Sequence, residues 1–540
     1  MYIATSNDIK LLKQKHKIIH TRITVKDRDF MSIAEVQGAC TAVSYSVSSD
    51  SGIRRSAEIT VIVKDDRYNA SKDSLFWIDK IIKLEIGYES IITGEVTYYN
   101  LGHYLITENS FNYSPESKEL SMSLVDLMSM FTGERGGFLT GKETKITIYS
   151  GYDIEEATEI LDGDDEEAKS KLVKNKIIDA IKATVKGGTT GIQGWDKMNI
   201  TYEDYEIPYD MEWGAGVSVY EILEELINLY TSYEFFFDVD GYFVCQKIPT
   251  GYGDPILLND TILHDLIIEE PHKNNYSTVF NVTEVYGKCW DTDYFVDETV
   301  KNGNQYDCVL NIENFVYKQE RYYGFTVPEG ASLNDESPKI KINDLAVLDI
   351  VNDDGTPLKA GTLQENYSYV VRIGDLGKVN GNTGSESIAA FYQGQYQIHA
   401  ISTLWNKKPS EEVQNEYKTK YNCLNMSFVV SPENPFAIDR IGDVVNKPIE
   451  DEVIWLDKDC LERAEYENWK TTVLTDTVSM QTIIIPWLDV NEKIEHTVDI
   501  KTDKTPQQYI IKSLSCDFMS GVMECELINF YEEAYNLPRE

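Results

Sequence analysis

The sequence predicts a mainly β protein with α+β parts. Two related β-barrel domains of a tube-like kind are expected to flank an α+β domain and a β-rich middle region. Three observations predict this class: period-two alternation in residues 1–132 and 441–540, two helical patterns between them, and a set of segments that recurs in the same order near both ends. At 540 residues the chain is too long for a single core, and such a length is typical of about three to four domains.

The first predicted domain, residues 1–132, consists of strands. CTAVSYSVSS from Cys40 and AEITVIVK from Ala57 alternate apolar with polar residues and are rich in β-branched side chains. HYLITENSFNY and KELSMSLVD follow as the two strands of a hairpin that turns at residues 114–117. Such a set of strands favours a barrel or a sandwich.

The second predicted domain, residues 133–274, combines helices with a hairpin. One helix carries an apolar stripe at helical spacing and ends at Gly187–Gly188. The stripe is formed by Leu172, Ile177, Ile178 and Ile181. A second helix begins after Ser218, which fits an N-cap and can form a capping box with Glu221. YEFFFDVDGYFVCQKI then predicts a hairpin that turns at residues 239–241.

Two further domains are predicted in the rest of the chain. Residues 275–440 return to strands and loops, with a small β insertion near residues 305–400, where strands alternate with Gly- and Asp-rich turns. Residues 441–540 contain a short helix, DCLERAEYENWK, followed by the strands of the second barrel.

Segments of the N-terminal domain recur near the C-terminus. The stretch from His103 aligns with the stretch from Gln508 after a loop two residues shorter. The aligned positions are Tyr104 with Tyr509, Ile106 with Ile511, Tyr113 with Phe518, Leu120 with Met523, Met122 with Cys525, Leu124 with Leu527, and Asp126 with Asn529. Upstream, residues 57–63 resemble residues 478–485, and residues 76–86 resemble residues 486–500, with Trp77 matching Trp487. The shared order favours one duplicated module over two unrelated hairpins.

This duplication has two consequences. Tyr104, Ile106, Tyr509 and Ile511 are expected in the barrel cores, where they would serve the ring and not an active site. Three copies of the chain would contain six similar barrels, enough for a pseudo-sixfold ring with threefold true symmetry.

The charge of the chain limits the partners it can have. Its 50 basic and 90 acidic side chains leave a net charge of −40, which repels nucleic acid and anionic lipid. We therefore expect no specific nucleic-acid binding, although like charge would suit a passage that DNA must traverse. The N-terminus lacks the apolar region of a signal peptide, and no apolar stretch is long enough for a membrane anchor.

Cysteine and histidine spacing indicates no metal centre. The eight cysteines contain no CxxC pair, and Cys516 and Cys525 lie symmetrically about Ser520–Gly521. A two-residue hairpin would place this pair opposite each other, so a cross-strand disulfide is possible, but buried free thiols are favoured in a reducing cytoplasm. His16 and His20 have the i,i+4 spacing of helical metal ligands without a third ligand or an HExxH motif.

Acidic and aromatic runs have structural explanations. The segment Asp238–Gly241 resembles the start of a calcium loop, but position twelve is Pro249, so a turn is expected. The run 162–167 is expected to be a solvated acidic loop before a helix, with cation binding as the alternative. Phe235–Phe237 favours a core strand over a stacking platform. With no GxSxG, Walker A or Cys–His signature, we expect no catalytic, cofactor-binding or metal-binding residues.

Residues 79–137, 218–249, 434–444 and 461–469 together resemble the baseplate hub proteins of tailed phages and contractile injection systems. This family also forms the N-terminal module of siphophage tail-associated proteins. The resemblance implies a structural homotrimer whose two tube-like barrels line the DNA ejection channel. It implies contacts with the tail tube or distal tail ring protein, with the central spike or tail-tip protein and with the tape measure protein.

The same resemblance implies a location in the virion, at the tail tip, after assembly in the cytoplasm of a bacterial host. The chain ends at Glu540, about where the second barrel should end. We therefore expect no C-terminal peptidase, lysozyme or fibre domain, and no enzyme activity.

Three alternatives stay open. In a receptor- or glycan-binding tail-tip protein, the 305–400 insertion would bind the receptor or glycan. A cell-wall hydrolase of the tail would use an unrecognised pair among the many carboxylates. A cytoplasmic β-rich scaffold unrelated to virions is the third.

Overall fold

The computed structural model covers the chain with gaps and confirms a mainly β protein. It describes residues 2–37, 40–68, 71–72, 74–114, 117–139, 143–162, 165–188, 197–201, 205–230, 233–249, 256–274, 276–289, 292–312, 315–318, 321–328, 330–352, 356–363, 365, 368–373, 387–391, 397–423, 425–432, 434–455, 457–473, 476–497 and 506–529. Strands take up 42% of the described residues and helices 19%, so β structure dominates as the alternating segments predict.

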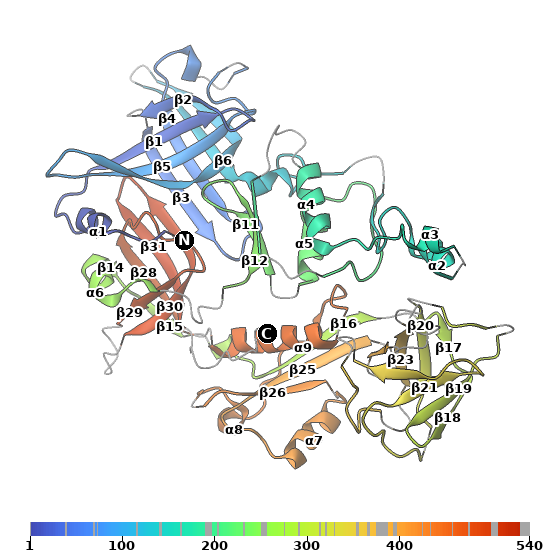
Figure 1. Cartoon of the computed structure of the whole chain (residues 1–540). Helices are drawn as coiled ribbons and strands as arrows, with labels where there is room; N and C mark the ends of the chain where they lie inside the picture. Colours follow the sequence, from blue (N-terminus) through green and yellow to red (C-terminus); the bar gives the residue numbers. More distant parts are fainter. Residues whose placement is uncertain are drawn as a thin grey trace.

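A 14-stranded sheet joins the two ends of the chain (Figure 1). From the N-terminal part it takes β1 (Ile19–Lys26), β2 (Ser32–Gln37), β3 (Cys40–Ser48), β4 (Arg55–Ile62), β5 (Ile81–Glu89), β6 (Val96–Tyr113) and β7 (Lys118–Asp126). From the C-terminal part it takes β28 (Asp476–Ile483), β29 (Lys493–His496), β30 (Gln507–Asp517) and β31 (Val522–Asn529). It also includes β13 (Ile256–Leu258), β14 (Ile267–Glu269) and β15 (His272–Asn274).

Short helices border this sheet. They are α1 (Ser6–Leu12), α6 (Asp260–Leu263) and the 3-10 turns η1 (Asp66–Tyr68), η2 (Leu127–Met130), η3 (His264–Leu266) and η4 (Tyr276–Thr278). In α1, Thr5 and Asp8 form a capping box, which satisfies the first backbone donors of the helix.

Helices and small sheets form the region after the first strands. Its elements are β8 (Thr144–Ile146), α2 (Ile154–Asp162), α3 (Glu166–Lys169), α4 (Ile177–Gly188), β9 (Met198–Ile200), β10 (Met211–Trp213), α5 (Val219–Asn228), β11 (Tyr233–Phe237) and β12 (Phe243–Lys247). The predicted capping box of Ser218 and Glu221 begins α5. The prediction that Leu172 belongs to the apolar stripe of α4 is wrong. Leu172 precedes α4, which begins only at Ile177, and it packs near Ile148 and Tyr149.

Two more sheets lie in the middle of the chain. The first contains β16 (Val282–Cys289), β25 (Gln397–Trp405), β26 (Met426–Val430) and β27 (Ile449–Glu450), with α7 (Glu411–Lys420), α8 (Ile438–Ile441) and α9 (Asp457–Val473). The second contains β17 (Tyr294–Phe295), β18 (Glu298–Asn302), β19 (Gln305–Val309), β20 (Tyr322–Thr326), β21 (Lys339–Ile342), β22 (Leu348–Val351), β23 (Ser368–Ile373) and β24 (Ser387–Phe391). The second is inserted between β16 and β25 and has a core of its own, as the predicted β insertion requires. Figure 1 shows α9 lying along the first sheet.

The predicted pair of closed barrels is not confirmed. The described strands run in one open path, β14-β28-β31-β30-β3-β4-β7-β6-β5-β1-β2, with β13, β15 and β29 attached beside it. The pairing of β3 with β30 makes the two ends of the chain continuous. Segment 256–274 pairs with β28 and β29, so it extends the C-terminal part of the sheet. The four domain boundaries stay predictions.

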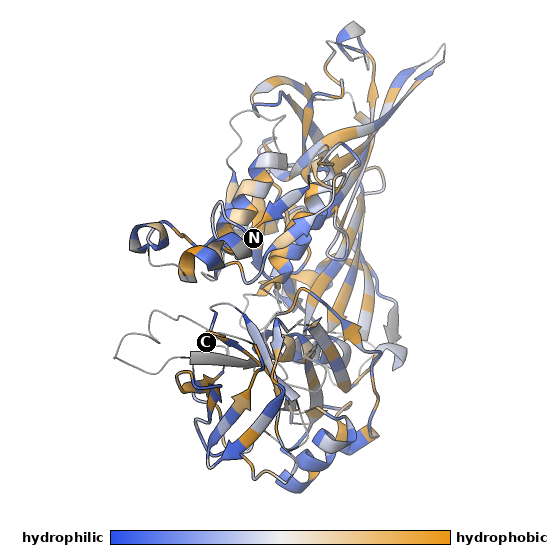
Figure 2. Ribbon diagram, turned by 90° about the vertical axis from the view of Figure 1, so that its right-hand side faces the viewer, coloured by the Kyte–Doolittle hydropathy of each residue, from blue (hydrophilic) through white to orange (hydrophobic). Residues whose placement is uncertain are grey.

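One hydrophobic core lies behind this sheet and draws on both ends of the chain. In β4 and β7 every second residue is buried, because neighbouring side chains on a strand point to opposite faces. Figure 2 shows the resulting alternation of hydrophobic and hydrophilic bands along the long strands. Tyr104, Ile106, Tyr509 and Ile511 are all buried in this core, as predicted.

The pairing registers agree with the internal repeat seen in the sequence. Hairpin β6–β7 and hairpin β30–β31 pair equivalent residues with each other. The equivalent pairs are Tyr104–Asp126 and Tyr509–Asn529, Ile106–Leu124 and Ile511–Leu527, and Phe111–Leu120 and Cys516–Met523. The preceding strand agrees as well. Its equivalent pairs are Ala57–Leu124 and Val478–Leu527, Ile59–Met122 and Met480–Cys525, and Val61–Leu120 and Thr482–Met523.

The two hairpins also share an irregularity. The register of β6–β7 shifts between Ile106 and Glu108, and the register of β30–β31 shifts between Ile511 and Ser513. A bulge with its extra residue at the same aligned position is not required by hairpin pairing in general. It therefore favours one duplicated module over two unrelated hairpins.

Equivalent core positions should contribute equally to stability. Ile106→Ala and Ile511→Ala each remove a buried side chain (3% and 0% exposed) and should each lower the free energy of unfolding by about 2–5 kcal/mol in urea denaturation. Val300→Ala, at an exposed position in β18, is the control and should change it by less than about 0.5 kcal/mol. A loss at only one of the two isoleucines would contradict the equivalence.

Candidate functional site: the polar face of the sheet and the junction behind it

The face of the large sheet that points away from the core is polar. A shallow hollow of about 710 Å³ lies over β3, β4, β7, β30 and β31. It is lined by Ser44, Tyr45, Ser46, Ser56, Ala57, Glu58, Ser123, Leu124, Val125, Gln481, Ser515, Cys516, Asp517, Ser520, Val522 and Glu524. Six of these are serines, three are carboxylates, and none is Lys or Arg. We call this surface the hydroxyl face.

Side chains of the hydroxyl face form rows across the strands. One row runs from Gln481 to Glu524, Ser515, Ser46 and Ser56, each opposite the next. Gln481 donates to Glu524 at 3.0 Å, and the Ser46 and Ser56 hydroxyls are 2.9 Å apart. The row crosses from β30 to β3 without interruption, so both copies of the repeat contribute to one surface.

The seam between β3 and β30 is held at both ends by backbone hydrogen bonds. Phe518 N donates to Val43 O at 3.0 Å, and Ser49 N donates to Lys512 O at 3.0 Å. Lys512, the bulge residue of β30, also forms an ion pair with Asp50 at 2.9 Å. These contacts fix the register in which the two halves of the sheet meet.

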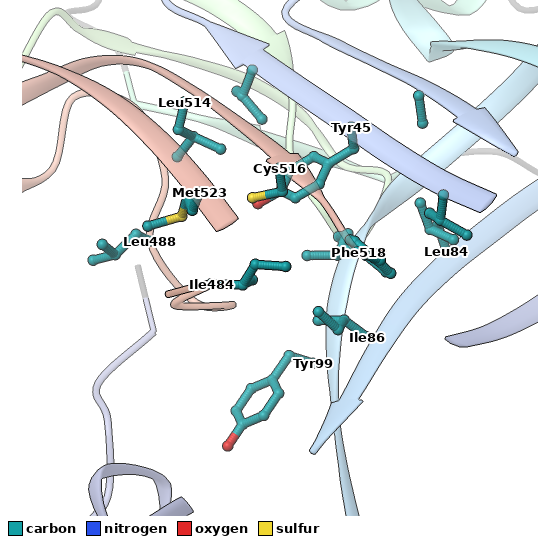
Figure 3. Close-up of a cluster of buried hydrophobic side chains, with 14 of the residues drawn as sticks. Tyr45, Leu84, Ile86, Tyr99, Ile484, Leu488, Leu514, Cys516, Phe518 and Met523 are labelled. Carbon is teal, nitrogen blue, oxygen red and sulfur yellow. The ribbon is translucent and has the colours of Figure 1, made fainter. Parts of the chain in front are cut away.

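Behind the seam the two halves share apolar side chains (Figure 3). Tyr45 of β3 meets the Phe518 ring edge-on, with ring centroids 6.5 Å apart, and lies beside Cys516. Burial raises the pKa of the Cys516 thiol well above its usual value and raises that of Cys525 to about 12, because a charged thiolate is unfavourable in an apolar core.

The spacing of the two cysteines is misleading about their geometry. Both are free, and they are not opposite each other: Cys516 faces Met523, and Cys525 faces Leu514. The loop that closes the hairpin is longer than two residues, since Asp517 and Val522 form the last pair. The disulfide alternative therefore lacks the opposed geometry it needs.

Two adjacent arginines at the start of β4 connect three parts of the chain. Arg55 is 2% exposed; its guanidinium donates to the Asp489 carboxylate and to Phe237 O at 3.0 Å, while its backbone N donates to Asp126 at 2.9 Å. It thereby links β4 and β7 to β11 and to the turn at residues 489–492.

Arg54 reinforces the same junction. Its guanidinium pairs with Glu234 at 2.7 Å and lies 3.8 Å from the centroid of the Phe236 ring. Asn491 also donates to Glu234, at 3.0 Å. Phe236 therefore acts in the junction, in keeping with the predicted structural role of the run Phe235–Phe237.

Two carboxyl groups of the junction have raised pKa values. Burial raises the pKa of Asp126 to about 6, against the hydrogen bonds it accepts from the Arg55 and Met128 backbone. Burial, and then the Asp489 charge, raise the pKa of Glu492 to about 8. A neutral Glu492 is favoured there because two carboxylates in one buried turn repel each other.

The histidine pair of the sequence does not form a helical metal site. His16 lies in a bend after α1, and His20 lies in β1, where it contacts Glu89 at 2.7 Å. Within the described residues no group of three or more His, Cys, Asp or Glu is placed to hold a metal ion.

The acidic segments have ordinary structural roles. Asp238 accepts the Asp240 and Tyr242 amides, and Gly241 has a φ of +78°, so the predicted turn is confirmed. In the run 162–167, Asp165 accepts the amides of Glu167 and Ala168 at the start of α3; residues 163–164 lie outside the described residues. No helix in the described part of the chain has both the length and the apolar character of a membrane span.

Three comparisons with known proteins gave one family model, no curated protein and several solved structures. A family model described as a domain of unknown function (DUF5048) matches residues 433–535. No curated protein matches the sequence. Among solved structures, the tail protein from Neisseria meningitidis MC58 is 9% identical with a TM-score of 0.42, over 95% of this chain and 99% of that one.

Two further structures are similar to the same extent. The prophage MuSo2 43 kDa tail protein from Shewanella oneidensis is 8% identical with a TM-score of 0.42, over 94% of this chain and 98% of its own. Prophage tail protein gp18 from Listeria monocytogenes EGD-e is 8% identical with a TM-score of 0.40, over 96% and 95%. Each is named a tail protein, and each likeness is too distant to establish a function.

Arg55 should be among the most sensitive positions in the chain. Arg55→Met should lower the free energy of unfolding by about 3 kcal/mol, because the buried Phe237 carbonyl and the partly exposed Asp489 carboxylate both lose their donor. Arg67→Met is the control, since it breaks only the exposed pair with Asp65, and its urea midpoint should stay near that of the natural protein. Equal midpoints for the two variants would contradict the junction's role.

Glu492 should make the protein less stable as pH rises. Because its pKa is raised to about 8 in the folded chain, its contribution is fully present below its unfolded pKa and is lost as pH rises through about 8. Glu492→Gln should flatten the fall of the urea midpoint between about pH 5 and pH 8. Glu492→Ala should show the same flat dependence of the urea midpoint on pH, with a midpoint below that of Glu492→Gln at every pH. An unchanged slope in both variants would contradict the assignment.

Proposed function

We propose that the chain is a structural hub protein of a phage-like tail tip. It assembles as a homotrimer whose ring joins the tail tube or distal tail ring protein to the central spike or tail-tip protein, and its bore conducts DNA. The tape measure protein is a further partner during assembly. The protein acts by assembly and conduction, without catalysis.

One observation carries the proposal: two copies of one strand module, with the same register and the same bulge, meet edge to edge within one chain. An edge-to-edge contact between unlike edges is heterologous, and its repetition builds a ring when the rotation closes. Two modules in each chain make three chains the smallest set that gives six positions.

The hydroxyl face supports the conducting role. Its lining offers hydroxyls and the carboxylates Glu58, Asp517 and Glu524, with no Lys or Arg. Lys and Arg supply the counterion release that holds proteins on a phosphate backbone. A bore lined by this face would therefore let DNA pass without holding it.

Mass measurement and imaging test the proposal. Light scattering should give the mass of three chains, and negative-stain images should show rings with a central opening. A chain that stays monomeric at every concentration would rule out the ring. Rings in which the hydroxyl face points outward, mapped by thiol labelling of Ser56→Cys before and after assembly, would rule out the conducting bore.

A further inference from the structure

The outer part of β6 carries an open strand edge with an exposed apolar surface. In β6, residues 107–113 are all exposed, and β7 is the strand that pairs with them among the described residues. Phe111 is 51% exposed and Tyr113 65%. Their repeat equivalents in the C-terminal hairpin, Cys516 and Phe518, are 3% and 8% exposed. The exposed fractions differ because β3 lies beside β30, whereas no strand of the described chain lies beside this part of β6.

Segment 267–274 occupies in the C-terminal module the position that β3 holds in the N-terminal one. In β3, Cys40 and Ala42 pair with Val61 and Thr60 of β4, with a register shift between them. The matching pairs of β14 with β28 are Ile267–Thr482 and Glu269–Gln481, again with a shift between them. Farther along, Tyr45–Ala57 is matched by His272–Val478. The outer edge of β14–β15 has no partner strand within the described residues.

Pro271 does not block that outer edge. Its carbonyl accepts a hydrogen bond from Ser479 N at 3.1 Å, so its backbone faces β28. A proline lacks one donor, and in a strand the N–H and C=O of a residue point to the same side. The missing donor is therefore on the paired side, and the outer edge keeps its own.

We propose that the outer part of β6 in one copy pairs antiparallel with the β14–β15 edge of a second copy of this chain. The intrachain seam sets the register: Ser46 is opposite Ser515, and the equivalent pair is Lys273 opposite Ser110. The inference rests on the proposed ring and names the contact that closes it. Each copy then donates one edge and accepts one.

A cysteine pair tests this register. Along this seam the odd-numbered residues Val43 and Ser49 form backbone hydrogen bonds with Phe518 and Lys512. Ser46 and Ser515 are therefore a non-hydrogen-bonded pair, in which side chains come closest. In a Cys289→Ser background, which removes the exposed native thiol, Lys273→Cys with Ser110→Cys should give a covalent trimer on a non-reducing gel.

Two control pairs accompany this variant. Ser46→Cys with Ser515→Cys should form an intrachain disulfide and shows that the geometry of the seam allows the bond. Lys273→Cys with Phe111→Cys should form none, because a one-residue slip moves the side chain to the opposite face. A disulfide in this slipped pair and none in the Ser110 pair would overturn the register.

A charge on the open edge provides an independent measurement. Phe111→Asp should abolish the trimer in light scattering and leave the far-UV circular dichroism spectrum unchanged, because Phe111 is exposed in the single chain. Val300→Asp, at a similarly exposed position of β18 (54%), should keep the trimer. A trimer that persists in Phe111→Asp and forms no Lys273→Cys/Ser110→Cys bond overturns this contact and leaves the ring intact. A natural chain that never trimerises overturns the ring and this contact together.

Discussion

The pairing of β3 with β30 is the constraint on which the rest of the molecule depends. It converts two strand modules from opposite ends of the chain into one sheet with one core and one hydroxyl face. Arg55 secures the arrangement from behind, since its single side chain reaches the Asp489 turn and β11 at once. Arg55 is thus a buried contact that the α+β region shares with both modules.

Charge is placed differently in the junction and on the hydroxyl face. Arg54 and Arg55 are buried and paired with carboxylates, while the lining of the hydroxyl face has carboxylates and serines without Lys or Arg. A buried guanidinium without its acceptors would be costly, so the acidic groups around it are structural. The large negative net charge is thus compatible with an ordinary folded core.

Local patterns in the sequence were sufficient to predict helices, strands and turns, but not to predict which strand edges pair with each other. Alternation, the Ser218 capping box and the turn at Gly241 predicted the strands, α5 and the β11–β12 hairpin. The repeat alignment predicted four buried core residues and the common register. Alternate serines in β3, β7 and β30 were a signal for a shared polar face. Which strand edges meet could not be read, because backbone hydrogen bonds leave no side-chain signature.

One wrong prediction and two features that the sequence left open have the same physical origin. The position of segment 256–274 beside β28 depends on tertiary pairing with strands far later in the chain. Cys516 and Cys525 are symmetric in sequence, yet the length of the hairpin loop moves each beside a different partner. Leu172 has the spacing of the α4 stripe, but the helix starts after it. Spacing alone cannot specify where a turn ends.

The seam also constrains when the molecule can fold. Ser49 and Lys512 are 463 residues apart, so a ribosome finishes nearly the whole chain before β3 finds its neighbour. Until then the nascent N-terminal strands expose an unpaired strand edge to which another chain can bind. On a polysome, β30 of a neighbouring chain whose synthesis is already complete can pair with this edge first. The result is domain swapping, in which two chains exchange identical segments. Slow synthesis of the last hundred residues would therefore favour domain-swapped chains over chains in which β3 pairs with its own β30.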